Sequence, residues 1–396
     1  MRAQAQVPEP RANREPPSLD LAIDHVGLSI GNSRRLTGVR LNWRDEGVIR
    51  VDGLNITLWA PGQNPRATVG GLAVGLVAPG AATLNGIVGG GVGIRAERRL
   101  TGLGVAGGAV LSHGSITGMT IGGLAVVGDG NVSGINAAGL AVMSRAQLTG
   151  LNIAGASVIG SGGARGIQVG GLAAVVQREL VGITVGGLAV VSEGPASGLT
   201  VSGLGVAARG DMTGVGLGGL VAFASGRMRG VHVGGLATVA EGGASGVTAG
   251  GLAVVSSGAV RGLTLTAGPV MAGRDVLGVT VAGLGVVADG DVRWVALTAG
   301  TLTGKRDATG ALMGLYRVRS PRVTGIAVSA LNVRTAELRG IAVGAHNDIH
   351  QQRGLVIGVY NDARRLHGVQ LGLLNRARDN PRWARLLPLV NARFGK

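Results

Sequence analysis

The sequence predicts an all-β fold, an elongated β-solenoid with about sixteen residues per turn that is capped at both ends. Three observations favour this class. Glycine recurs at an unbroken interval of sixteen residues, aliphatic residues alternate in short segments between these glycines, and polar turns separate the segments. A short fixed period is typical of units that cannot bury an apolar face alone and therefore stack on their neighbours. The repeating glycines are Gly86, Gly102, Gly118, Gly134, Gly150, Gly166, Gly182, Gly198, Gly214, Gly230, Gly246, Gly262 and Gly278.

The unit at residues 182–197 illustrates the expected path of the chain. Its two apolar segments read as strands, and the paired glycines Gly186-Gly187 between them read as a tight corner. If the chain folds back at this corner, the two segments become opposite walls of a narrow tube. We therefore expect four aliphatic side chains of this unit to point into one interior, namely Ile183, Val185, Leu188 and Val190.

A polar column between the aliphatic ones is expected to face solvent and to stack from rung to rung. Stacked threonines favour a pleated surface and cross-strand hydrogen bonds. Ala189 and Val191 should also lie outside, which would leave an apolar strip on one wall. The polar column is interrupted by Gly216 and otherwise consists of Asn136, Asn152, Gln168, Thr184, Thr200, His232, Thr248, Thr264 and Thr280.

Changes in this pattern divide the chain into five segments. Residues 1–17 carry four prolines among polar neighbours and are expected to form a flexible leader. The remaining segments are an N-terminal β cap with imperfect repeats (18–65), regular sixteen-residue repeats (66–308), shorter Asn-containing repeats (309–378) and a C-terminal cap (379–396).

The repeat loosens towards its C-terminal end. Trp294 occupies the place of the repeating glycine, and the later glycines come at intervals of fifteen and then fourteen residues. A column of asparagines appears in the same region, and its side chains are expected to hydrogen-bond along the array. These residues are Asn332, Asn347, Asn361 and Asn375.

Composition and charge narrow the functional classes. The net charge of +16 is concentrated in residues 301–396, which contribute +11 of it. Aromatic residues make up only 2% of the chain, so the stacking platforms of single-strand nucleic-acid binders are missing and no nucleic-acid partner is expected. The basic C-terminal end is instead expected to attract an anionic envelope polymer or a lipid surface.

The chain offers no convincing catalytic, cofactor-binding or metal-binding residues. Cysteine is absent, so thiolate metal sites are excluded. His346 and His350 stand four apart but lack a third ligand, and Asp289-Gly290-Asp291 lacks the spacing of calcium-binding β-rolls. Ser112-His113 gives no credible triad, and Gly89-Gly90-Gly91 is not followed by the Gly-Lys-Ser/Thr of a phosphate loop. We therefore expect no enzyme and no cofactor.

The segment 325–375 and the ending Leu386-Leu387-Pro388-Leu389-Val390-Asn391 resemble bacterial surface-repeat proteins with tandem Gly-Leu-x-x-Gly-Leu-x-Asn units. The resemblance implies a surface, outer-membrane or secreted location and no enzymatic activity. No export signal stands in the sequence, although Ala3-Gln4-Ala5 has the form of a signal-peptidase site. The leading hypothesis is a non-catalytic repeat protein with a structural or adhesive role. Its partner is an unknown surface or a second copy of the chain.

An outer-membrane β-barrel pore is the alternative. Segments such as 182–191 have the length of a strand that crosses a bilayer. Read as one straight strand, however, this segment is apolar on both faces, so neither face suits a water-filled lumen. Equal connection lengths and scarce aromatic residues also favour the solenoid.

Overall fold

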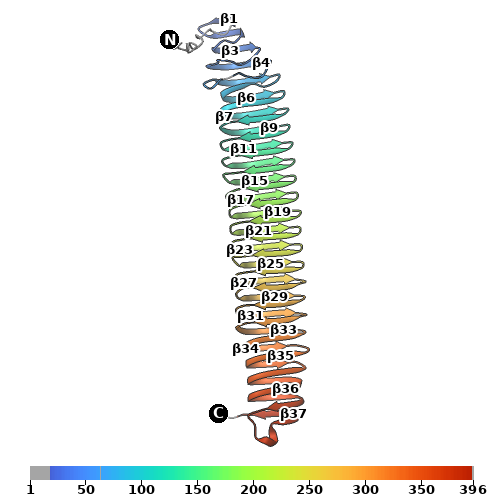
Figure 1. Ribbon diagram of the computed structural model, residues 1–396. Coiled ribbons are helices and arrows are strands. Elements are labelled where there is room, and N and C mark those ends of the chain that lie inside the picture. The colour runs from blue at the N-terminus through green and yellow to red at the C-terminus, as the bar shows by residue number, and fades with distance from the viewer. Residues whose placement is uncertain (1–17, 63, 395–396) are drawn as a thin grey trace, which may run out of the picture. The chain divides into compact units, whose positions relative to one another are not determined.

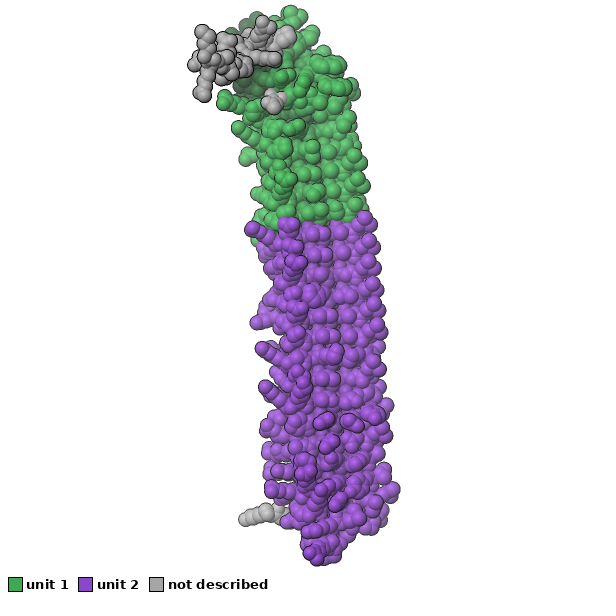
Figure 2. Space-filling model, viewed as in Figure 1, with its two compact units in different colours: residues 1–171 green, residues 172–396 purple. Residues whose placement is uncertain are grey.

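The computed structural model describes residues 18–62 and 64–394, so the leader predicted at residues 1–17 lies outside the described residues. The protein is an all-β solenoid of about twenty turns with about sixteen residues in each, as the glycine interval predicted. Figure 1 shows the strands stacked as successive rungs. The chain comprises two compact units, residues 1–171 and 172–396, which are coloured separately in Figure 2.

The first unit begins with an antiparallel pair and continues with parallel ladders. β1 runs antiparallel to β2, and β2 to β7 then pair in parallel, each with the next strand along the chain. From β8 onwards short and long strands alternate. The strands of this unit are β1 (Ser18–Ile23), β2 (Val26–Gly31), β3 (Arg35–Asn42), β4 (Arg50–Thr57), β5 (Thr68–Gly75), β6 (Gly80–Gly90), β7 (Gly93–Ala106), β8 (Ala109–Ser112), β9 (Ser115–Gly122), β10 (Ala125–Gly128), β11 (Val132–Ala138), β12 (Ala141–Ser144), β13 (Leu148–Ala154), β14 (Ser157–Gly160) and β15 (Ala164–Gly170).

The second unit repeats the short and long strands and ends with a reversal. Each strand in its regular part pairs in parallel with the strand one full turn later, and β37 closes the unit antiparallel to β36. The elements are β16 (Ala173–Val176), β17 (Leu180–Gly186), β18 (Ala189–Ser192), β19 (Ala196–Ser202), β20 (Gly205–Ala208), β21 (Met212–Gly218), β22 (Val221–Ala224), β23 (Met228–Gly234), β24 (Ala237–Ala240), β25 (Ala244–Gly250), β26 (Ala253–Ser256), β27 (Val260–Thr266), β28 (Pro269–Ala272), β29 (Val276–Ala282), β30 (Gly285–Ala288), β31 (Val292–Thr298), β32 (Thr301–Gly304), β33 (Asp307–Gly314), β34 (Arg317–Val328), β35 (Asn332–Val343), β36 (His346–Ala377), the 3-10 helix η1 (Arg382–Ala384) and β37 (Leu386–Arg393).

The repeating glycine is required by two features of the backbone. Gly198 adopts a φ of 109°, which L side chains rarely tolerate. A Cβ atom at this position would also lie 2.1 Å from the carbonyl oxygen of Gly182 on the preceding rung. Both conditions recur at equivalent glycines of both units, for example Gly134 and Gly246, so the sixteen-residue interval reflects a steric requirement of the regular rungs, from which the rung of Trp294 departs.

The side chains of the long strands face the opposite way from the sequence-based expectation. Thr184 is fully buried, whereas Ile183 remains 42% exposed and Leu188 48% exposed. Of the four aliphatic residues expected inside this unit, only Val190 is buried. The predictions that the threonine and asparagine column faces solvent and that Ile183 and its equivalents fill the core are therefore wrong. The expectation that Ala189 and Val191 lie on the outer surface holds, because both are partly exposed.

The interior of this rung is narrow at its glycine corner. The two walls lie so close at the corner that a Cβ atom at Gly186 would come within 2.2 Å of the carbonyl oxygen of Ala189. Small residues therefore occupy the inward positions beside this corner, whereas a larger aliphatic residue, Leu180, is buried at the other end of the long strand. In this rung the inward positions are Leu180, Thr184, Gly186, Val190 and Ser192.

The asparagine column hydrogen-bonds from rung to rung in three of its four members. The side-chain amide of Asn347 donates to Oδ1 of Asn361 at 2.7 Å, and Asn361 donates to Oδ1 of Asn375 at 2.7 Å. The prediction is confirmed for these residues. Asn332 lies one position away from the column, in register with His346, and its side-chain amide donates to the backbone carbonyl of His346 at 3.3 Å instead of to another asparagine.

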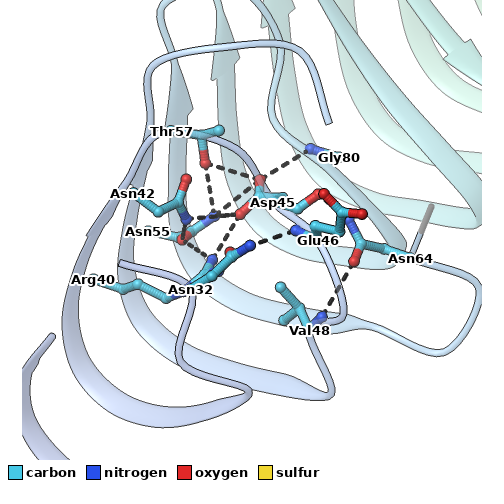
Figure 3. A network of polar contacts seen from close by, with 10 residues as sticks. All are labelled: Asn32, Arg40, Asn42, Asp45, Glu46, Val48, Asn55, Thr57, Asn64 and Gly80. Atoms are coloured by element: carbon cyan, nitrogen blue, oxygen red, sulfur yellow. Dashed lines mark hydrogen bonds and ion pairs between the residues drawn. The ribbon is translucent and has the colours of Figure 1, made fainter. Parts of the chain in front are cut away.

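A buried ionic network lies in the first rungs of the first unit (Figure 3). Arg40 is in register with Asn55, and its guanidinium donates to Oδ1 of Asp45 at 2.6 Å and to Oδ1 of Asn55 at 2.8 Å. Asp45 also accepts hydrogen bonds from Thr57 and Asn42. Burial lowers the pKa of Arg40, and the charge of Asp45 opposes this effect. The first rungs of the unit therefore enclose a paired charge beside buried aliphatic residues such as Leu36 and Val51.

Candidate functional site

The histidine, serine and aspartate residues that the sequence offers as candidates for metal binding or catalysis do not assemble into a reactive centre. Nowhere in residues 18–62 and 64–394 do three or more histidine or carboxylate side chains form a group that could hold a metal ion. His346 and His350 both lie on β36, and the ring of His346 packs edge-on against Tyr360. Asp289, by contrast, lies in a turn and pairs with Lys305 at 2.7 Å.

Ser112 and His113 point to different environments. The hydroxyl of Ser112 is buried and donates to the backbone carbonyl of Ser115. His113 is exposed and lies between two carboxylates, 3.1 Å from Asp129 and 3.8 Å from Glu97. Asp129 in turn contacts Arg145 at 3.1 Å. Glu97, His113, Asp129 and Arg145 recur at sixteen-residue intervals on successive rungs, so they form a solvated polar ladder, and exposed pairs of this kind contribute little to stability.

The outer wall formed by the long strands is aliphatic in both units. The residue that follows the repeating glycine faces solvent there instead of the core. Because the parallel ladders are in register, these side chains stack into a continuous outward column. Exposed members in the first unit are Met119, Ile135 and Ile167, and those in the second unit are Ile183, Val231, Leu263 and Val279.

A leucine column follows the corner next to the paired glycines. It is exposed in both units, and the leucine is half or more exposed at several rungs. The opposite edge of each rung carries the longer turn, with arginine, aspartate, glutamate, serine and glycine. Each rung thus has an apolar edge and a charged edge. The leucines are Leu124 and Leu140 in the first unit and Leu172, Leu188, Leu204, Leu220, Leu236, Leu252 and Leu284 in the second.

The basic residues near the C-terminal end gather around an open cleft. Arg319 and Arg334 are in register on β34 and β35, so like charges stack on adjacent rungs. Lys305 and His350 line the same cleft, whose volume is about 540 Å³. Arg334 pairs with Asp348 at 3.4 Å and Lys305 with Asp289, so part of the positive charge is neutralised.

Another basic cleft lies further towards the N-terminal end of the second unit. It has a volume of about 580 Å³, and its lining includes Arg227, Arg229, Arg261 and Arg274. Sequence reasoning missed this site because the segment 51–300 carries a net charge of only +3. A usable signal would have been the local combination of these arginines with turns made of glycine and alanine.

Comparison of this chain with protein-family models, with curated proteins and with solved structures found no match. Within the described ranges, no helix has the length and apolar character needed to cross a bilayer.

Proposed function

We propose that this chain is a non-catalytic repeat protein of the cell envelope, or a secreted one, with a structural or adhesive role. The observation that supports this role is the in-register column of outward aliphatic side chains on the long-strand wall of each unit. A solvated wall of this composition loses unfavourable contact with water when a partner covers it. Its regular spacing suits a partner surface that is itself repetitive.

The charged turns support the same proposal. They keep one edge of each rung soluble while the wall remains free to make contact. At the basic C-terminal end, the cleft lined by Lys305, Arg319 and Arg334 suits an anionic envelope polymer or lipid headgroup. Self-association of the chain through its aliphatic wall would serve the same structural role.

Cell fractionation combined with protease shaving tests the location. We expect the native protein in the envelope or secreted fraction, with its turns accessible to protease from outside the cell. Binding tests with the polymers of that compartment then identify the surface. Recovery of the protein only from the cytosol would contradict the proposal.

A pair of variants tests the role of the wall. Ile183→Thr, Val231→Thr and Val279→Thr replace exposed aliphatic residues on the long-strand wall while preserving β-branched shape. The control carries Val175→Thr, Val191→Thr and Val239→Thr on the short-strand wall, where the side chains are also partly exposed. We expect the first variant to be released from the envelope fraction by a high-salt wash and the control to be retained. Equal retention of both variants would argue against adhesion through the long-strand wall.

A further inference from the structure

The basic cleft of the second unit lies where the turn residues have little or no side chain. Two successive turns have only glycine or alanine at their tips, Gly242-Gly243 and Gly258-Ala259, and these residues line the cleft. The flanking turns carry Arg227 on one side and Arg274 on the other. The result is a hollow whose floor is backbone and whose rim is guanidinium.

The cleft carries an excess of positive charge. Within residues 18–62 and 64–394, the side chains of Arg227, Arg229, Arg261 and Arg274 form no ion pair, whereas Arg145 pairs with Asp129 and Arg209 with Glu193. The one carboxylate in the lining is Glu241. Four guanidinium groups around one carboxylate leave an excess of positive charge, and their forked donors match the geometry of oxyanions.

The arginines are also arranged along the stacking direction. Arg229, Ser245 and Arg261 are in register on successive rungs, and Arg261, Leu277 and Arg293 continue the same column. Arg293 pairs with Asp291 at 2.6 Å, so Arg229 and Arg261 are the members that offer unneutralised charge. Adjacent parallel strands lie roughly 4.8 Å apart, so arginine recurs at intervals of roughly 10 Å along this face. A linear ligand with regularly spaced negative charges fits such a column better than a compact anion does.

An aromatic ring stands beside the last of these arginines. Trp294 follows Arg293, is 70% exposed, and occupies the column that glycine fills on the neighbouring rungs. Its φ of 93° is one that L residues rarely adopt. The repeat would accept glycine here without strain, so the tryptophan is retained against a backbone penalty. Strain of this kind is concentrated at functional positions.

We propose that this face of the second unit binds an acidic polysaccharide. The carboxylate or sulfate groups of the polymer bind the guanidinium groups of the cleft, and a sugar ring stacks on Trp294. The large amphipathic face of tryptophan suits a sugar ring, which has an apolar side and polar edges. A nucleic acid fits less well, since successive bases need several aromatic platforms and this face has one. The inference rests on the proposed adhesive role and names a partner for it.

Binding of the full-length chain to alginate and to heparin tests the proposal, because these probes present carboxylate and sulfate groups respectively. Polyphosphate, neutral dextran and vesicles containing anionic lipid are the comparison ligands. We expect binding to at least one acidic polysaccharide, weaker binding to polyphosphate and vesicles, and none to dextran. Equal binding to polyphosphate or to vesicles would overturn the proposal, as would no binding to either polysaccharide.

Three variants locate the site. Arg229→Ser with Arg261→Ser installs the residue already present in this column at Ser245, and we expect an affinity loss of about tenfold. The control, Arg145→Ser with Arg209→Ser, removes the same charge from the turn edge outside the cleft and should change affinity by less than about twofold. Trp294→Gly should weaken binding while raising the thermal midpoint, a combination that a purely structural role for the tryptophan excludes. Equal losses in the cleft variant and the control would reject the site.

The cellular location of the protein and the binding of polysaccharide by the cleft are tested by separate experiments, and either prediction can be wrong without the other. If the chain resides in the envelope but the cleft variant binds the polysaccharide as tightly as the wild type, this inference alone is wrong. If the cleft binds the polysaccharide as expected but the native chain is cytosolic, the proposed function is wrong and the binding site stands.

Discussion

At the scale of single residues, Gly216 and His232 interrupt the inward threonine column of the second unit, and the two residues complement each other in shape. Gly216 and His232 are in register on β21 and β23. A Cβ atom at Gly216 would lie 2.8 Å from Nδ1 of His232 and 2.7 Å from Sδ of Met212. The imidazole therefore uses space that the glycine leaves empty. Neither ring nitrogen of this fully buried histidine has a hydrogen-bond partner of good geometry.

This complementarity predicts coupling between the two positions. Gly216→Thr alone should lower the stability of the second unit by about 1–3 kcal/mol, because the added atoms collide with His232. Gly216→Thr combined with His232→Thr should recover part of this loss, since it removes the collision with the imidazole and an unsatisfied ring but leaves the contact with Sδ of Met212. Thermal midpoints and hydrogen exchange of β21 and β23 would measure both effects. Additive effects of the two substitutions would contradict the pairing.

The same histidine predicts a pH dependence. Burial lowers the pKa of His232 below its ordinary value of 6.5, and the backbone of Arg229 opposes this shift only in part. As pH falls through 6.5, the unfolded chain takes up a proton that the folded chain refuses, so the folded state loses stability. We expect the wild type to lose more stability between pH 8 and pH 5 than the Gly216→Thr, His232→Thr variant, as followed by thermal melting. Parallel pH profiles of the two proteins would exclude this role.

At the scale of the element, the long strand depends on its glycine. At Gly214 the φ is 104°, and an added Cβ would lie 2.3 Å from the carbonyl oxygen of Gly198. No rotamer relieves this clash because the obstacle is backbone. The glycine therefore sets both the conformation of its own strand and the distance to the preceding one.

Substitution of this glycine should be far more costly than substitution of its neighbour. Gly214→Ala is expected to destabilise the second unit by at least about 2 kcal/mol, which combines the unfavourable φ with displacement of the adjacent strand. Thr213→Ala changes an exposed side chain and should alter stability by less than about 0.5 kcal/mol. Hydrogen exchange of β19 and β21 would show the difference. Similar exchange in both variants would mean that the rung adapts to a side chain at this position.

At the scale of the whole molecule, each regular rung is supported by its two neighbours in the same unit. Stability in such an array is approximately a sum of intrinsic rung terms and interfaces between adjacent rungs. Inward columns repeat in register, as in the pairing of Val190 with Val206 and of Thr184 with Thr200. A rung can therefore be removed without changing the kind of contact that its neighbours make.

This organisation predicts the outcome of two deletions. Removal of residues 199–214 joins Gly198 to Val215 and preserves every column, so the protein should remain soluble and rich in β-structure, with a slightly lower thermal midpoint. Removal of residues 199–206 brings long strands opposite short ones and should cause aggregation or loss of structure. Circular dichroism and size-exclusion chromatography distinguish the cases. Equal folding of both deletions would show that the register is not limiting.

The sequence alone predicted the path of the backbone better than the direction of the side chains. The glycine interval reports a steric condition that each rung must meet, so it predicted the stacking and the number of residues per turn. Ile183 and Thr184 were assigned to the wrong sides because apolar character was equated with burial. The inward positions of this strand are Leu180, Thr184 and Gly186, a set that mixes apolar, polar and glycine residues and that apolar character alone does not single out.

The basic cleft was beyond sequence reasoning for a different reason. Arg229 and Arg261 are thirty-two positions apart in the chain, and their proximity follows from the register of three strands. The absence of side chains at Gly242 and Gly258 becomes a hollow only when the flanking turns are stacked beside them. Charge counted along the chain does not contain this information.

The strand reversals at β1 and β37 have a consequence for assembly. A parallel ladder with an open end is a template on which further copies could add end to end, as they do in amyloid fibrils. Each terminal strand here runs against the direction of its neighbour, so an incoming parallel rung meets the wrong hydrogen-bonding pattern. Fibril growth from either end is thereby disfavoured, while the sides of the molecule stay free to bind.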